Sequence, residues 1–136
     1  RDEEIMAKEY KYRGKTLEEL KKMEFKEFVL LLPSRKARSL KRGIPEDQKA
    51  LMKKIEKAIQ GSYKKIIKTQ NRDVIVTPKM VGLMIHVHAG NRYAPVMIEP
   101  EMIGMYLGEL VLTRNRVKHS APGVGATRSS SAISVR

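Results

Sequence analysis

The 136-residue sequence contains no cysteine and no tryptophan, and it has only two phenylalanines. Without cysteine the chain cannot form a disulfide, act through a thiol nucleophile or build a cysteine-based zinc site, which fits a reducing compartment. With so few aromatic residues, the core has to be built from Ile, Leu, Val and Met. Because compact domains usually span roughly 100–200 residues, we expect one small domain with tails.

Long apolar runs are also missing. The longest, from Phe28 to Leu32, is far shorter than the roughly 20 residues that a membrane-spanning helix needs. No secretory signal peptide is visible. We therefore expect a soluble, intracellular protein.

Acidic residues are scarce relative to basic ones. The chain has 28 Lys and Arg against 15 Asp and Glu, a formal net charge of +13. Such an excess predicts a polyanionic partner. Nucleic acid is the commonest one, because each neutralised phosphate releases a counterion. A membrane surface is the alternative.

The positive charge is concentrated in two segments. Residues 1–27 hold eight basic and eight acidic side chains, and residues 73–112 have a net charge of −2. Residues 34–72 hold 13 Lys and Arg against three acids, and the chain from Thr113 onward has five basic residues and no acid. This distribution favours two contact regions for nucleic acid over a uniformly basic, solvated surface.

Two long helices are predicted in the first half of the chain. The run Thr16-Leu17-Glu18-Glu19 has the form of a capping box, so the first helix should start at about Leu17 and end near Pro33. The second should begin at Pro45 and end at Gly61. Its apolar stripe consists of Leu51, Met52, Ile55, Ala58 and Ile59.

Strand patterns follow Gly61. Apolar and β-branched residues at 74–76, 83–88 and 93–98 predict three strands. The last two should pair as a hairpin, because Ala89-Gly90-Asn91 has the composition of a turn.

Proline and glycine define the remaining elements. Pro95 lacks an N–H, so its strand should lie at a sheet edge or have its ladder interrupted there. Residues 100–107 are predicted to form a short helix that stops at Gly108. From Ser120 to Arg136 the chain is rich in Gly, Ser and Ala without periodicity, which predicts a flexible tail.

Clustered basic residues are the strongest candidates for a binding site. Arg35, Lys36, Arg38, Lys41 and Arg42 precede Gly43, and such a cluster can contact several phosphates, with Arg adding bidentate geometry. A nuclear targeting signal is the alternative interpretation. A second group lies just before the predicted sheet and consists of Lys64, Lys65, Lys68 and Arg72.

Features that would indicate catalysis are few. His86 and His88 should face the same side of a strand, but a metal site needs a third ligand and none is evident. A metal-dependent hydrolase built on this pair is the rival enzyme hypothesis. No nucleophile motif, glycine-rich phosphate loop or paired carboxylates support catalysis. We therefore expect no catalytic residue, no metal and no cofactor.

Several motifs occur in the order typical of one known family. They are Arg38-Ser39-Leu40-Lys41-Arg42-Gly43, residues 51–58, residues 75–83, His86-Val87-His88-Ala89-Gly90-Asn91 and residues 107–114. Together they resemble the family of universal small-subunit ribosomal protein nineteen, called fifteen in eukaryotes. The resemblance covers roughly residues 36–123, and the N-terminal segment and the tail resemble the archaeal and eukaryotic branch.

The resemblance implies an α+β fold with a small three-stranded sheet, packed helices, an N-terminal helical extension and a flexible basic C-terminal tail. The expected division is an extension at 1–33, an RNA-binding core domain at 34–119 and a tail at 120–136. The implied role is structural and non-enzymatic, in the small-subunit head of cytoplasmic ribosomes. The implied partners are ribosomal RNA and small-subunit protein thirteen. The protein would also lie close to contacts with the large subunit, and its tail would lie near tRNA at the decoding site. Neither a membrane nor a homo-oligomer is expected.

The predicted RNA contacts combine both basic regions with the hairpin turn. They are Lys36, Arg38, Ser39, Lys41, Arg42, Lys64, Lys68, Arg72, Asn91, Arg92, Arg114, Arg116, Lys118 and His119. Because base-stacking aromatic residues are sparse, recognition should act mainly through the RNA backbone and shape. The alternative function is that of a non-ribosomal basic protein that binds nucleic acid.

Overall fold

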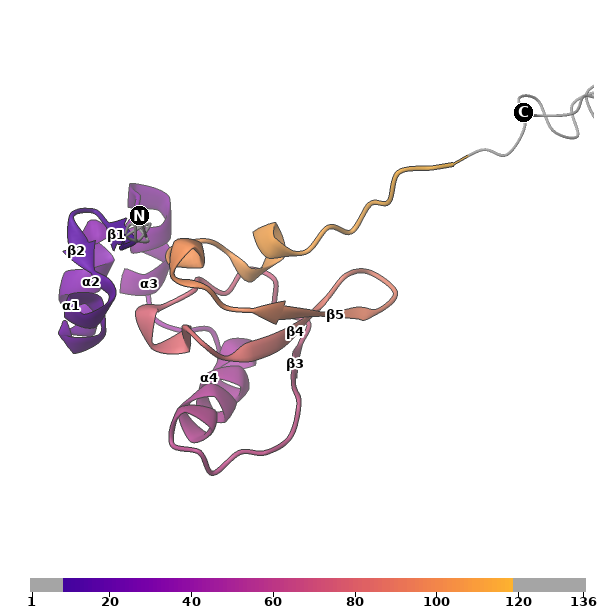
Figure 1. The fold of residues 1–136 in the computed structure, drawn as a ribbon, viewed down its shortest axis with the longest axis horizontal. Coiled ribbons are helices and arrows are strands. Elements are labelled where there is room, and N and C mark those ends of the chain that lie inside the picture. The colour runs from indigo at the N-terminus through magenta and orange to yellow at the C-terminus, as the bar shows by residue number, and fades with distance from the viewer. Residues whose placement is uncertain (1–8, 119–136) are drawn as a thin grey trace, which may run out of the picture.

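The computed structural model describes residues 9–118; the predicted flexible tail at 120–136 lies outside them. The first half of the described chain is mainly helical (Figure 1), with α1 (Leu17–Lys22), α2 (Phe25–Leu31), α3 (Ser34–Lys41) and α4 (Glu46–Ile59). The strands are β1 (Lys11–Tyr12), β2 (Lys15–Thr16), β3 (Ile67–Thr69), β4 (Met84–His88) and β5 (Tyr93–Met97). Three short 3-10 turns complete the fold: η1 (Pro78–Met80), η2 (Pro100–Met102) and η3 (Leu107–Leu110).

The main sheet has the order β3-β4-β5, with β3 parallel and β5 antiparallel to β4. The predicted α+β class, three-stranded sheet and hairpin are therefore confirmed. The parallel strand β3 was not predicted, because three residues are too few to show an alternating pattern after a run of lysines. A separate antiparallel pair, β1 and β2, precedes the first helix.

Pro95 lies in β5, an edge strand of the main sheet. This is the first of the two alternatives predicted for it. The bond from Ile98 N–H to the Leu83 carbonyl is 3.0 Å long, and the bond from Ala89 N–H to the Arg92 carbonyl is 2.7 Å. Since bonded pairs recur at every second residue of an antiparallel ladder, the Pro95 pair with His86 is a non-bonded one. Its nitrogen faces away from β4, and the ladder loses no bond.

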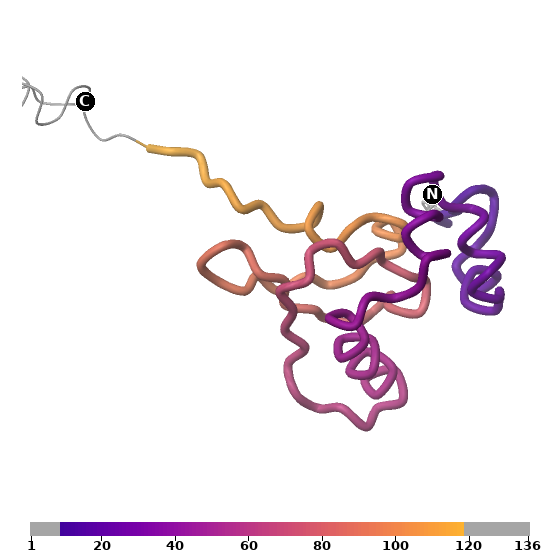
Figure 2. The backbone as a smooth tube through the Cα atoms, turned by 180° about the vertical axis from the view of Figure 1, so that it is seen from behind, coloured from indigo at the N-terminus to yellow at the C-terminus, as the bar shows by residue number. Residues whose placement is uncertain are grey.

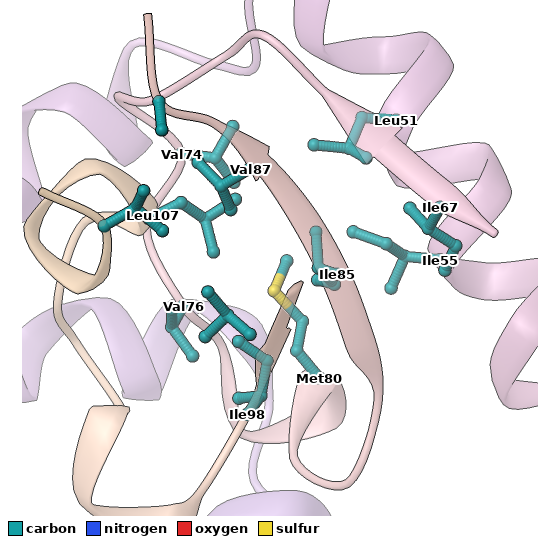
Figure 3. Close-up of a cluster of buried hydrophobic side chains, with 13 residues drawn as sticks. Leu51, Ile55, Ile67, Val74, Val76, Met80, Ile85, Val87, Ile98 and Leu107 are labelled. Carbon is teal, nitrogen blue, oxygen red and sulfur yellow. The ribbon is translucent and has the colours of Figure 1, made fainter. Parts of the chain in front are cut away.

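The larger hydrophobic core lies between α4 and the sheet (Figure 3). Leu51 and Ile55 of α4 pack against a cluster that includes Ile67 of β3 and Ile85 of β4. Ile85 and Val87 are fully buried, which fixes one face of β4 toward the core. As predicted, this core is aliphatic, and Met80 is among its most deeply buried side chains.

A second core cluster attaches the N-terminal helices to the rest of the protein. Leu20 of α1 and Phe28 and Val29 of α2 pack in one cluster with Ile75 and Ile103, residues distant in sequence. The N-terminal elements consequently sit at one end of the molecule, opposite the β4–β5 hairpin loop (Figures 1 and 2).

The predicted single helix from Leu17 to Pro33 is wrong. The capping box at Thr16 is present, but Met23 and Glu24 are extended and separate α1 from α2. Leu20 and Val29 are nine residues apart, so a straight helix would place them on opposite sides. The break allows both side chains to enter the same cluster, which explains it. The second predicted helix is confirmed as α4, beginning one residue after Pro45.

The predicted strand at 74–76 and the predicted helix at 100–107 are both wrong, and for the same reason. Residues 74–76 run alongside residues 104–107, with Val76 N–H donating to the Met105 carbonyl at 2.8 Å and Leu107 N–H to the Val74 carbonyl at 2.9 Å. Only one isolated bridge, between Ile75 and Tyr106, qualifies as sheet pairing. Because this pairing takes the backbone groups that a helix would use, only the turns η2 and η3 remain.

Candidate nucleic-acid interface

Helix α3 presents most of the first basic cluster to solvent. Ala37 is buried toward the N-terminal cluster, whereas Arg38, Lys41 and Arg42 are exposed. The cations Arg38 and Lys41 lie in the last turn of α3, where the negative end of the helix dipole stabilises them. Ser39 is exposed and donates its hydroxyl to the Arg35 carbonyl at 3.1 Å, which leaves its oxygen free to accept.

Lys36 points inward instead. Its ammonium donates to the Gly104 carbonyl at 2.6 Å and lies 4.0 Å from a carboxylate oxygen of Glu109. It also lies 4.8 Å from the ring centre of Tyr106, within the range of a cation–π contact. Lys36 therefore fastens α3 to the 104–109 segment.

The second predicted group is divided between surface and interior. Lys64 and Lys68 are exposed, and the Lys68 ammonium lies 5.6 Å from the ring centre of Tyr93 across the sheet. Arg72 is half-buried and donates to the carbonyls of His88, Gly108 and Val111. The chain thus uses this arginine for internal contacts.

His86 and His88 share one face of β4, as predicted, because Ile85 and Val87 take the core face. The His88 ring packs edge-on against Tyr93, with ring centres 5.0 Å apart, and its Nδ1 accepts from Gly90 N–H at 3.2 Å. Across residues 9–118, no three His, Asp or Glu side chains gather in a group that could hold a metal ion. In the same residues, no helix is long and apolar enough to cross a membrane.

The hairpin loop and the C-terminal segment lie together. Asn91 and Arg92 in the loop are exposed, as are Arg114, Arg116 and Lys118; His119 lies outside the described residues. A surface hollow is lined jointly by loop residues 89–92 and by Leu112, Thr113 and Asn115. Thr113 and Asn115 were not among the predicted RNA contacts: Thr113 lies in the motif at 107–114, but only Arg114 was chosen there for its charge, and no pattern singles out Asn115.

Apart from Lys64 and Lys68, the exposed predicted residues form two separate groups. Those of α3 lie beside the N-terminal helices, while the hairpin loop and the C-terminal segment extend from the opposite end in both views (Figures 1 and 2). Both groups offer hydrogen-bond donors with positive charge, the chemistry that phosphate groups require.

The sequence is similar to those of known proteins. The sequence profile of the family described as Ribosomal protein S19 matches residues 38–119. The small ribosomal subunit protein uS19 of Thermoplasma volcanium is 53% identical over 124 residues, which cover 91% of this chain and 79% of that protein. The chain therefore belongs to the ribosomal protein S19 family and is a structural, non-enzymatic component of the small ribosomal subunit.

Proposed function

We propose that this chain binds ribosomal RNA in the head of the small subunit, within cytoplasmic ribosomes. The observation that carries the proposal is the exposure of clustered donors on α3, on the approach to β3, on the hairpin loop and on residues 112–118. The contacting residues are Arg38, Ser39, Lys41, Arg42, Lys64, Lys68, Asn91, Arg92, Arg114, Arg116 and Lys118, together with His119 beyond the described residues.

Lys36 and Arg72 have a supporting role in this proposal. Their cationic groups are bonded to backbone carbonyls within the protein, so they orient the surfaces that contact RNA. The division into an extension at 1–33, a core domain at 34–119 and a tail at 120–136 also stays a prediction.

The finer placement follows from the family resemblance. Small-subunit protein thirteen would be a neighbour, contacts with the large subunit would lie close by, and the tail would extend toward tRNA at the decoding site. The basic residues Arg128 and Arg136 in that tail would be attracted to RNA there.

The test is binding of the full chain to an RNA fragment from the small-subunit head, measured across salt concentrations. An unrelated folded RNA and a duplex DNA serve as competitors. Tight binding that both competitors fail to displace is the expected result. Equal binding to all three would favour the alternative, a general basic nucleic-acid-binding protein.

A charge-matched pair of variants tests the residues. The first variant combines Arg38→Ala, Lys41→Ala and Arg42→Ala; the control combines Lys53→Ala, Lys54→Ala and Lys57→Ala on the exposed face of α4. Removing one cation that neutralises a phosphate should reduce the slope of log affinity against log salt by about 0.9 or somewhat less. The α3 variant should reduce this slope for each cation that contacts a phosphate. The α4 variant should change the slope little. Equal reductions would mean that only net charge matters.

A further inference from the structure

Arg72 joins three separate parts of the backbone. Its guanidinium donates to the His88 carbonyl, to the Gly108 carbonyl at 2.7 Å and to the Val111 carbonyl at 2.6 Å. The main chain adds a further link, since Gly108 N–H donates to the Arg72 carbonyl at 2.8 Å. A Cβ atom at Gly108 would lie 3.0 Å from both the Cβ and the carbonyl oxygen of Arg72. The absence of a side chain at position 108 is what allows this close approach.

The carbonyls that accept from Arg72 lie close to the first residues of two segments, the hairpin loop and the C-terminal segment. His88 ends β4 and directly precedes the hairpin loop 89–92. Gly108 lies in η3, and Val111 directly precedes the exposed segment 112–118. Arg72 therefore holds the start of the loop and the start of the C-terminal segment in a fixed relation.

A polar hollow lies between these two segments. Its lining includes Gly90, Asn91, Arg92, Leu112, Thr113 and Asn115. These residues provide two side-chain amides, one hydroxyl and one guanidinium, and none of them is acidic. Such a set can donate several hydrogen bonds to an anion.

We propose that this hollow binds a phosphate and the adjoining ribose of the RNA backbone, and that Arg72 is the positioning residue that assembles it. The inference rests on the proposed function and deepens it. Arg92 supplies the charge, while Thr113 and Asn115 hydrogen-bond to the sugar-phosphate oxygens. Arg92 comes from the hairpin loop, and Thr113 and Asn115 come from the C-terminal segment, so the hollow needs both segments.

Arg72 is a poor phosphate ligand itself. Three of its five N–H groups already donate to carbonyl oxygens, which carry partial negative charge. A phosphate would have to approach the remaining N–H groups next to these carbonyl oxygens, which repel it. Lysine at this position would keep the charge but would lack the planar fork that reaches several acceptors at once.

The decisive variants separate charge from geometry, with binding to the small-subunit head fragment as the readout. Arg72→Lys should weaken binding about tenfold, a typical size for coupled neighbouring residues, even though net charge is unchanged. The control Arg13→Lys, at an exposed turn between β1 and β2, should bind normally. Near-normal binding by Arg72→Lys together with a reduced salt slope for Arg72→Ala would instead make Arg72 a direct phosphate contact and overturn its positioning role.

A second set of variants tests the hollow without touching Arg72. Thr113→Val and Asn115→Ala combined with Arg92→Ala should weaken binding, and in this background Arg72→Lys should have no further effect. Amide exchange of Arg72→Lys should accelerate at 89–92 and 108–113 while α4 and β4 stay protected.

The two proposals fail in different ways. If wild type binds the fragment selectively but the Arg92, Thr113 and Asn115 variant binds equally well, the hollow proposal is wrong and the proposed function stands. If wild type does not prefer the fragment, the proposed function itself fails.

Discussion

Gly104 is held between the N-terminal hairpin and the end of α2. Its φ is +81°, and a Cβ atom there would lie 2.8 Å from the Tyr12 hydroxyl oxygen and 3.1 Å from a methyl carbon of Leu32. Any side chain at position 104 would therefore be disfavoured both by backbone strain and by steric contact. The Gly104 carbonyl additionally accepts from Lys36, so a shift of this loop would also disturb α3.

We expect Gly104→Ala to lower the free energy of unfolding by about 2–4 kcal/mol, measured by urea denaturation. Gly61→Ala is the matched control, since its φ is +75° but nothing lies within 4 Å of the added Cβ. That control should cost only about 1 kcal/mol from backbone strain. Equal costs for the two variants would show that the contact with Tyr12 is easily relieved.

Local sequence signals predicted the elements that depend on near neighbours. The capping box at Thr16, the apolar stripe of α4 and the β4–β5 turn are each encoded within a few residues. Two other features depend on contacts between residues distant in sequence, so no short pattern predicts them. They are the pairing of 74–76 with 104–107 and the parallel pairing of β3 with β4. The same holds for the site: exposure of the α3 cations was predictable, but the internal bonds of Arg72 were not.

Helix α2 provides a test of whether the N-terminal extension is energetically part of the domain. Phe28 is buried in the second cluster, while Leu30 on the same helix is 72% exposed. Phe28→Ala should lower the free energy of unfolding by about 3–5 kcal/mol, and Leu30→Ala by well under 1 kcal/mol. Because Ile75 and Ile103 share the Phe28 cluster, unfolding should remain a single transition. Separate transitions for α2 and the sheet would show that the extension is an independent unit.

Across the whole molecule, positive charges outnumber their opposite partners. The net charge is +13, and the described residues contain two ion pairs, Lys36 with Glu109 and Lys49 with Glu46. Repulsion among unpaired cations opposes the compact state of the free protein, whereas the same cations attract RNA. Salt should consequently have opposite effects on folding and on binding.

Raising KCl from about 10 mM to about 150 mM shortens the screening length from about 30 Å to about 8 Å. We expect the Tm of the free protein to rise over this range while its affinity for RNA falls. Replacing Lys53, Lys54 and Lys57 by Gln should reduce the rise in Tm. A Tm that decreases with salt would mean that attractive pairs outweigh repulsion in the folded state.

The edges of the main sheet affect how readily the free protein aggregates before it is assembled into a ribosome. At one edge, β5 offers no donor at Pro95, whose nitrogen faces away from β4. At the other, β3 spans only Ile67–Thr69 and exposes Lys68 in its middle. Short strands, prolines and lysines at edges discourage a second chain from adding a strand. A newly made copy waiting for its RNA is thereby protected from edge-to-edge aggregation.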